Sequence, residues 1–98
     1  VVLDDEIALE WARIPHFYTP FYVYQYATGF SAAIAISRKI FNGELGILEG
    51  YKKFLSGGCS DTPIELLKLA GVDMSHTGPV EEALKFFEEL LNEFEELA

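Results

Sequence analysis

The chain has 98 residues, of which 50% are hydrophobic and 23% charged, and its formal net charge is −9. This composition is too apolar for a disordered chain, and the acidic balance argues against a nucleic-acid partner and against attraction to anionic membranes. The hydrophobic fraction is high for so short a chain, because small domains have much surface for their volume. We therefore expect some apolar surface to face another polypeptide.

The cysteine content and the first residues favour a particular compartment and context. Cys59 is the single cysteine, so no intrachain disulfide can form, which favours a reducing compartment such as the cytoplasm. The chain begins at Val1 without a methionine or a signal-peptide pattern. We expect residues 1–98 to be one helical segment taken from a longer protein.

The first predicted helix begins at Asp4 or Asp5, either of which can cap it, and runs to about Arg13. Pro15 ends it, because proline has no amide hydrogen and pushes the residue before it toward extended geometry. A short connector over 16–19 follows.

The second predicted helix begins at Thr19–Pro20, a hydroxyl cap followed by proline in the first turn, and runs to about Phe41. It is apolar around most of its circumference, which is typical of a buried helix. Gly29 in its interior costs up to about 1 kcal/mol. We expect that glycine to allow a kink or a close contact with a partner helix or a ligand.

The apolar run Pro20–Ile36 raises the question of a membrane span. It only reaches the minimum span of roughly 17 residues. It also contains Tyr22, Gln25, Tyr26 and Thr28. We expect a buried central helix and no membrane association.

Three further helices are predicted. One covers Glu44–Leu55 and ends at Gly57–Gly58. A short one, capped by Asp61 or Thr62, runs to about Ala70, and the last begins at Pro79 with an acidic face turned to solvent. Without any convincing strand pattern, the prediction is an all-α array of about five helices.

The segment Ile14–Gly29, IPHFYTPFYVYQYATG, places a histidine before four tyrosines. A neutral tyrosine can donate a hydrogen bond to negative charge that develops on a carbonyl oxygen. Tyr22 and Tyr26, four residues apart, share one helical face; Tyr18 joins them only if the helix starts early, and Tyr24 points elsewhere. The alternative interpretation is an aromatic stripe that packs in a core.

The common sequence motifs for metal and phosphate binding are absent from these 98 residues. There is no His-Glu-x-x-His, no pair of cysteines and no glycine-rich phosphate loop. His16 and His76 are far apart and lack an obvious third ligand. We expect no metal site built from this chain alone.

Two stretches resemble a known family. Glu10–Tyr18 (EWARIPHFY) and Phe21–Gly29 (FYVYQYATG) resemble the C-terminal part of the oligoendopeptidase F group of thimet-oligopeptidase-like zinc metallopeptidases. Later stretches resemble the tail of the same family: Phe54–Gly58 (FLSGG), Pro63–Met74 (PIELLKLAGVDM) and Pro79–Leu84 (PVEEAL).

The resemblance implies an all-α, two-lobed zinc endopeptidase that cleaves short peptides in a deep channel. The zinc ligands would lie upstream of this chain, so the segment would bind no zinc and would be inactive alone. It would supply His16 and Tyr22 as catalytic residues that stabilise the oxyanion, with Tyr18 and Tyr26 as substrate-binding residues. Its partners would be a peptide substrate and the upstream part of the same catalytic domain.

The apolar composition leaves another interpretation open. A free-standing helical interaction module, without catalysis, would bury its apolar surface by self-association. An isolated piece of an enzyme would expose similar surface, so self-association of the isolated chain is expected in both cases.

Overall fold

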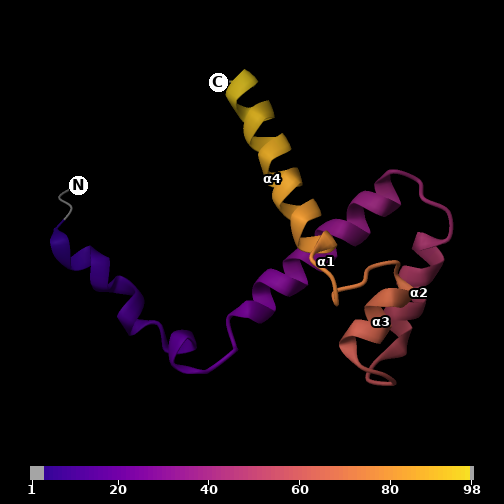
Figure 1. The fold of residues 1–98 in the computed structure, drawn as a ribbon, viewed down its shortest axis with the longest axis horizontal. Coiled ribbons are helices and arrows are strands. Elements are labelled where there is room, and N and C mark those ends of the chain that lie inside the picture. The colour runs from indigo at the N-terminus through magenta and orange to yellow at the C-terminus, as the bar shows by residue number, and fades with distance from the viewer. Residues whose placement is uncertain (1–3, 98) are drawn as a thin grey trace.

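The computed structural model describes residues 4–97, in which helices are joined by turns and no strand occurs (Figure 1). The elements are the 3-10 helices η1 (Asp5–Arg13) and η2 (Pro15–Tyr18) and the α-helices α1 (Tyr24–Phe41), α2 (Ile47–Gly57), α3 (Pro63–Leu69) and α4 (Gly78–Leu97). The predicted all-α fold class is confirmed.

The first predicted boundary is also confirmed. Ile14 is extended, with φ −84° and ψ 108°, and it separates η1 from η2 as Pro15 requires. Both elements on either side are 3-10 helices, whose tighter hydrogen bonding is common in short connecting pieces. The expected connector over 16–19 is therefore helical up to Tyr18.

The predicted start of the second helix at Thr19–Pro20 is wrong, because α1 begins only at Tyr24. Phe21 has φ +61°, which interrupts any right-handed helix at that position. The amide of Tyr22 donates instead to the carbonyl of Thr19, closing a turn. The predicted end of this helix is confirmed, with Asn42 as its C-cap.

The third helix also begins later than predicted, at Ile47 instead of Glu44. Gly43 and Gly46 have φ of +71° and +82°, so the intervening residues form turns. The helix ends as expected at Gly57, before Gly58 at φ +55°.

The last two helices follow the predicted signals. The Thr62 hydroxyl accepts a hydrogen bond from the Glu65 amide at 3.4 Å and caps α3, and Gly71 at φ +74° follows its end. The final helix starts at Gly78, next to the predicted Pro79.

Helix α1 is the centre of the packing. It contacts α2 on one side and α4 on the other, while α3 packs on α2. The buried cluster joins Ala32, Ala35 and Ile36 of α1 to Ala70 and Val72 after α3. Arg38 of α1 binds Glu89 of α4 at 2.6 Å, which ties these two helices together at the surface.

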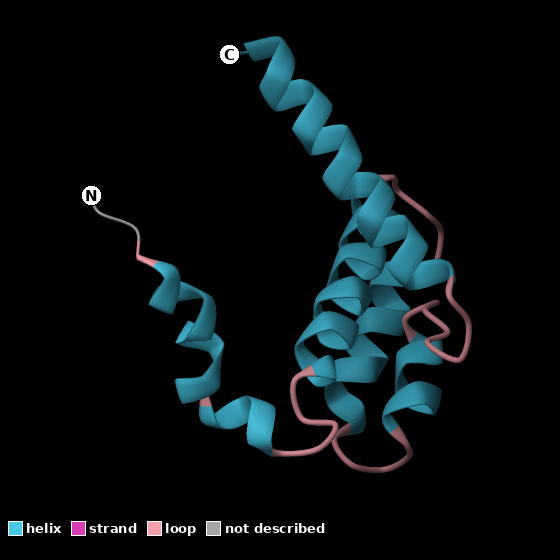
Figure 2. Ribbon diagram, turned by 60° about the vertical axis from the view of Figure 1, so that its left-hand side comes forward, coloured by secondary structure: helices cyan, strands magenta, loops and turns pink. Residues whose placement is uncertain are grey.

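The chain as a whole is extended. The arm formed by η1 and η2 leads away from the helices, and the C-terminal half of α4 projects from them (Figures 1 and 2). The Cα radius of gyration is 17.7 Å, against about 13 Å for a compact domain of this length. The accessible surface is 8047 Å², about 2,400 Å² more than a compact protein of 11.0 kDa exposes.

The length and the hydropathy of the described helices bear on the possibility of a membrane span. None of the helices within residues 4–97 combines the length and the apolar character needed to cross a bilayer.

Candidate functional site

Three of the predicted site residues lie side by side where the N-terminal arm meets α1. The rings of His16 and Tyr22 are stacked, with centroids 5.4 Å apart and planes 27° apart. The rings of Tyr22 and Tyr26 meet edge to face at 5.8 Å and 71°. We refer to His16, Tyr22 and Tyr26 as the aromatic cluster.

Each member comes from a different local structure. His16 belongs to η2, Tyr22 lies in the turn that follows, and Tyr26 lies in the first turn of α1. The two tyrosines remain neighbours although Tyr22 precedes the helix, because the amide of Tyr26 donates to the carbonyl of Val23 and continues the turn into α1. The two tyrosines are therefore neighbours as expected, although Tyr22 lies before the helix and not on the predicted helical face.

Phe21 sets the direction in which Tyr22 leaves the arm. A non-glycine residue with positive φ stores about 1–3 kcal/mol of strain, and such residues concentrate at functional sites. Its side chain is 85% exposed, so its contacts within the described chain offset little of that strain. Nothing in the sequence indicates the left-handed conformation of Phe21, because a phenylalanine rarely adopts it.

One hydrogen bond orders the two phenols of the aromatic cluster. The Tyr26 hydroxyl donates to the Tyr22 hydroxyl oxygen at 3.2 Å. This bond, which only the protonated Tyr26 can make, raises the pKa of Tyr26 above its usual value near 10. Tyr22 acts as acceptor toward Tyr26, so its own O–H remains available for another partner.

The aromatic cluster is open to solvent. Tyr22 is 37% exposed and Tyr26 60% exposed, and His16 is exposed as well. Within the described residues the aromatic cluster is not packed in a core, and the aromatic stripe stays an alternative prediction for the longer protein. A polar molecule can reach the Tyr22 hydroxyl and the His16 ring from solvent.

The structure does not bring Tyr18 into the aromatic cluster. Its hydroxyl donates to the carbonyl oxygen of Ala12 in η1, because the late start of α1 leaves Tyr18 on the arm. Tyr24 also lies apart, in a groove beside α3 with Thr62 and Ile64, which agrees with its predicted direction.

The described residues do not fit a zinc site. Among residues 4–97, no three His, Cys, Asp or Glu side chains lie close enough together to hold a metal ion. The His16 ring stacks on Tyr22, which is not a usual zinc ligand. Nε2 of His76 lies 3.7 Å from Oδ2 of Asp73. The Lys68 ammonium lies 3.9 Å from the same oxygen, and its positive charge would repel a metal cation.

Comparison with known proteins identifies a matching family and several similar proteins. The model of peptidase family M3 matches residues 1–86. Oligopeptidase PepF of Bacillus subtilis is 55% identical over 99% of this chain, and chromosomal oligoendopeptidase F of Lactococcus lactis subsp. cremoris is 49% identical over 96% of it. The crystal structure of oligoendopeptidase-F from Enterococcus faecium covers 96% of the chain with 54% identity and a TM-score of 0.86. The predicted resemblance is confirmed.

These relatives are much longer than the chain. It spans 14% of the Bacillus subtilis protein, 16% of the Lactococcus lactis protein and 18% of the Enterococcus faecium chain.

Proposed function

The chain belongs to peptidase family M3, and from this membership we propose that it is the C-terminal segment of a cytoplasmic oligoendopeptidase that hydrolyses short peptides. The names of the relatives and their greater length support this proposal. The partners of the segment would be the upstream part of the same catalytic domain and the peptide substrate. Residues 1–98 would act together as one segment of that domain.

The aromatic cluster is the observation that carries the proposed role. Tyr22 is held by stacking on His16 and by the hydrogen bond from Tyr26, and its own O–H is free to donate. A phenol fixed in this way can stabilise negative charge on the oxygen of an attacked peptide carbonyl without losing its proton. His16, an exposed imidazole beside it, would bind the same region of the substrate.

Zinc would be held by residues outside this chain. The donor set within residues 4–97 does not fit the ion, so the segment would contribute substrate contacts and not metal ligands. It follows that the segment alone would be inactive. Tyr26 would contribute by orienting Tyr22, whereas Tyr18 would reach the substrate only if its bond to Ala12 were exchanged.

Substituting Tyr22 by phenylalanine in the complete enzyme tests this role. Loss of one oxyanion donor typically costs about 2.7–4 kcal/mol of transition-state stabilisation, so we expect kcat to fall about 10²–10³-fold with KM little changed. Tyr24→Phe removes a hydroxyl from the neighbouring face and is the matched control. An unchanged kcat in Tyr22→Phe would exclude Tyr22 from the role.

The proposed role of His16 is tested by measuring both the activity and the zinc content of a variant. We expect His16→Ala to reduce hydrolysis while the zinc content per enzyme molecule stays the same, because the histidine stacks on Tyr22 and belongs to no group of three metal-ligating side chains within residues 4–97. Elemental analysis alongside the activity assay distinguishes the two effects. Loss of zinc in this variant would mean that His16 supports the metal site.

The second candidate function is a self-associating helical module without catalysis. The exposed apolar side chains favour it, since Phe41, Leu45 and Leu97 are almost fully open to solvent. Assay of the purified chain on a quenched peptide, with zinc supplied, bears on both candidates. Hydrolysis that a chelator abolishes would contradict the proposal that the segment is inactive alone.

A further inference from the structure

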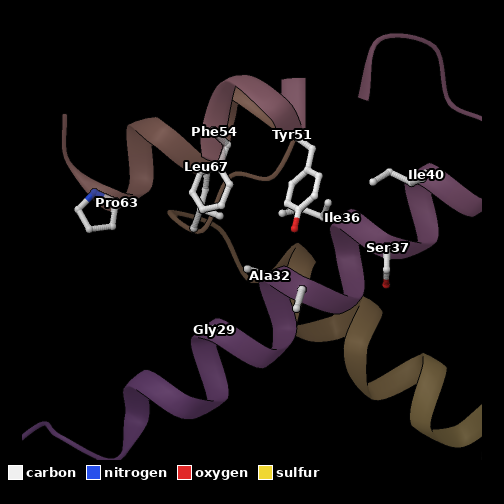
Figure 3. A pocket seen from close by; sticks show the side chains of 10 residues that line it. Gly29, Ala32, Ile36, Ser37, Ile40, Tyr51, Phe54, Pro63 and Leu67 are labelled. Carbon is white, nitrogen blue, oxygen red and sulfur yellow. The ribbon is translucent and has the colours of Figure 1, made fainter. Parts of the chain in front are cut away.

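An apolar hollow lies along one face of α1, between this helix and the helices α2 and α3 (Figure 3). Its floor is Gly29, Ala32 and Ala33, and its far wall is formed by Phe54 of α2 and by Pro63 and Leu67 of α3. A second hollow, beginning at Tyr24, shares Gly29, Pro63 and Leu67 with it and continues the groove toward the start of α1. We call the two hollows, of about 420 and 490 Å³, the α1 trough.

The shape and chemistry of the α1 trough suit a helix. It follows α1 from Tyr24 to Ile40, about 24 Å at a rise of about 1.5 Å per residue. Although the chain has 23 charged residues, none belongs to the residues that line the trough. A lining without charges gives no anchor for the termini of a free peptide, whereas it matches the apolar face of an amphipathic helix.

The packing within the described chain does not require a glycine at position 29, on the floor of the trough. A Cβ atom added there would meet nothing within 4 Å, and its backbone is helical. By contrast, a Cβ at Gly50 would lie 2.0 Å from the carbonyl oxygen of Leu69, so that glycine is required by the contact between α2 and α3. Glycine in a helix interior weakens the helix, and the benefit at position 29 must come from something that approaches from outside.

The longer polypeptide of the relatives is a source for the group that approaches Gly29. The chain makes up only 14–18% of them, and it exposes about 2,400 Å² more surface than a compact protein of its mass. About 800 Å² per partner is enough for a stable interface. The surplus is therefore large enough to be covered by packing within one long polypeptide.

We propose that the α1 trough holds the apolar face of an α-helix from the remaining part of the peptidase polypeptide, packed directly against Gly29. The proposal rests on the proposed function, because it takes the longer enzyme as the source of the helix. The small residues on the floor let the two helix axes approach closely, since the distance between packed helices depends on the side chains at the contact. The α1 trough is then a permanent intramolecular interface.

The test compares the same substitutions in two settings. One is the isolated chain, and the other is a chimera in which this chain replaces the matching segment of the Enterococcus faecium oligoendopeptidase-F. Gly29→Leu fills the trough, and Gly29→Ala is the milder variant should the first prevent folding of the chimera. Gly78→Leu is the matched control, because a Cβ at Gly78 also meets nothing within 4 Å and this glycine lies outside the trough.

Opposite effects in the two settings are expected. In the isolated chain, Gly29→Ala and Gly29→Leu raise or preserve the Tm of the helix signal, because both residues form helices better than glycine. In the chimera they lower the Tm by several degrees through overpacking, while Gly78→Leu leaves it unchanged. An unchanged Tm of the chimera in both Gly29 variants would overturn the proposal.

Two further outcomes separate the proposal from its alternatives. If Gly29→Leu abolished self-association of the isolated chain and left the chimera unaffected, the occupant would be a second copy of the chain and the proposal would be wrong. Chelator-sensitive hydrolysis by the unsubstituted chimera tests the proposed function separately. A folded but inactive chimera would contradict the function, and its Tm values would still decide the trough.

Discussion

At the scale of single residues, Tyr22 has a defined position among its neighbours. The His16 ring covers one side of its ring, and Tyr26 donates to its oxygen. A phenol that accepts one hydrogen bond becomes a better donor for the next, because hydrogen bonds in a chain polarise one another. Tyr26 is thus a positioning residue for Tyr22.

The hydrogen bond between the two tyrosines makes a prediction about titration. The bond from Tyr26 to Tyr22 raises the pKa of Tyr26, so Tyr22→Phe should bring that pKa back toward about 10. Because the pKa of Tyr26 is raised in the folded chain, the contribution of this bond to stability is complete below about pH 10 and is lost as the pH rises through the raised value. NMR titration of ring-labelled tyrosine measures the shift.

Tyr24→Phe is the control for that titration, since Tyr24 lies in the groove beside α3. It should leave the pKa of Tyr26 where it is. A Tyr26 that titrates identically with and without the Tyr22 hydroxyl would disprove the hydrogen bond.

The sequence predicted part of the aromatic cluster. The four-residue spacing of Tyr22 and Tyr26 was sufficient to bring them together, because local geometry determines that distance. The stacking of His16 on Tyr22 depends on the positive φ of Phe21, which no residue preference indicates. The attachment of Tyr18 to Ala12 likewise depends on how the arm folds back.

At the scale of the elements, α1 organises the structure and α2 and α3 form one wall beside it. The contact between α2 and α3 depends on Gly50, where the chain of α2 meets the backbone of Leu69. No side chain fits at that point. The arrangement of both helices, and with it the wall of the α1 trough, therefore depends on the absence of a side chain at position 50.

Gly50→Ala should destabilise the fold much more than a change of one methyl group suggests. The added Cβ would lie 2.0 Å from the Leu69 oxygen, so α2 and α3 must move apart, at a cost of about 1–3 kcal/mol or more. Urea unfolding followed by circular dichroism measures the loss. Gly29→Ala in the isolated chain is the control and should show none; equal stability of the two variants would refute the close contact.

Helix ends show clearly what the sequence could and could not predict. The helix boundaries at Pro15, Gly57 and Thr62 follow from local residue preferences, and the structure confirms them. The starts of α1 and α2 were predicted too early, because Thr19–Pro20 and Glu44 are acceptable starts by local preference. The left-handed residues Phe21 and Gly46 delay both helices, and this effect depends on the wider path of the chain.

At the scale of the whole molecule, the chain has the secondary structure of a domain without its compactness. Its radius of gyration is 17.7 Å, and its buried cluster consists largely of small residues. The distal half of α4 projects from the other helices (Figure 2). Its Leu91, Phe94 and Leu97 side chains are exposed. Apolar area of this size is usually covered in a folded protein.

The isolated chain should therefore associate with itself. Burial of apolar surface between copies stabilises their association by about 25 cal/mol per Å². Exposed apolar area is available for this on α1 and α4. Sedimentation velocity over a range of micromolar concentrations measures the assembly. The chimera, in which the same surface is covered, should show no concentration dependence beyond that of the Enterococcus faecium enzyme itself; a strictly monomeric isolated chain would contradict the expectation.

The central proposal is that Tyr22 stabilises the transition state of peptide hydrolysis in the complete enzyme. The most direct test measures how Tyr22→Phe changes the affinity for a peptide whose scissile amide is replaced by a tetrahedral phosphinate, and for the uncleaved peptide of the same sequence. We expect the phosphinate affinity to fall about 10²–10³-fold while the affinity for the uncleaved peptide stays nearly the same. Equal losses for both molecules, or no loss for either, would contradict the proposal.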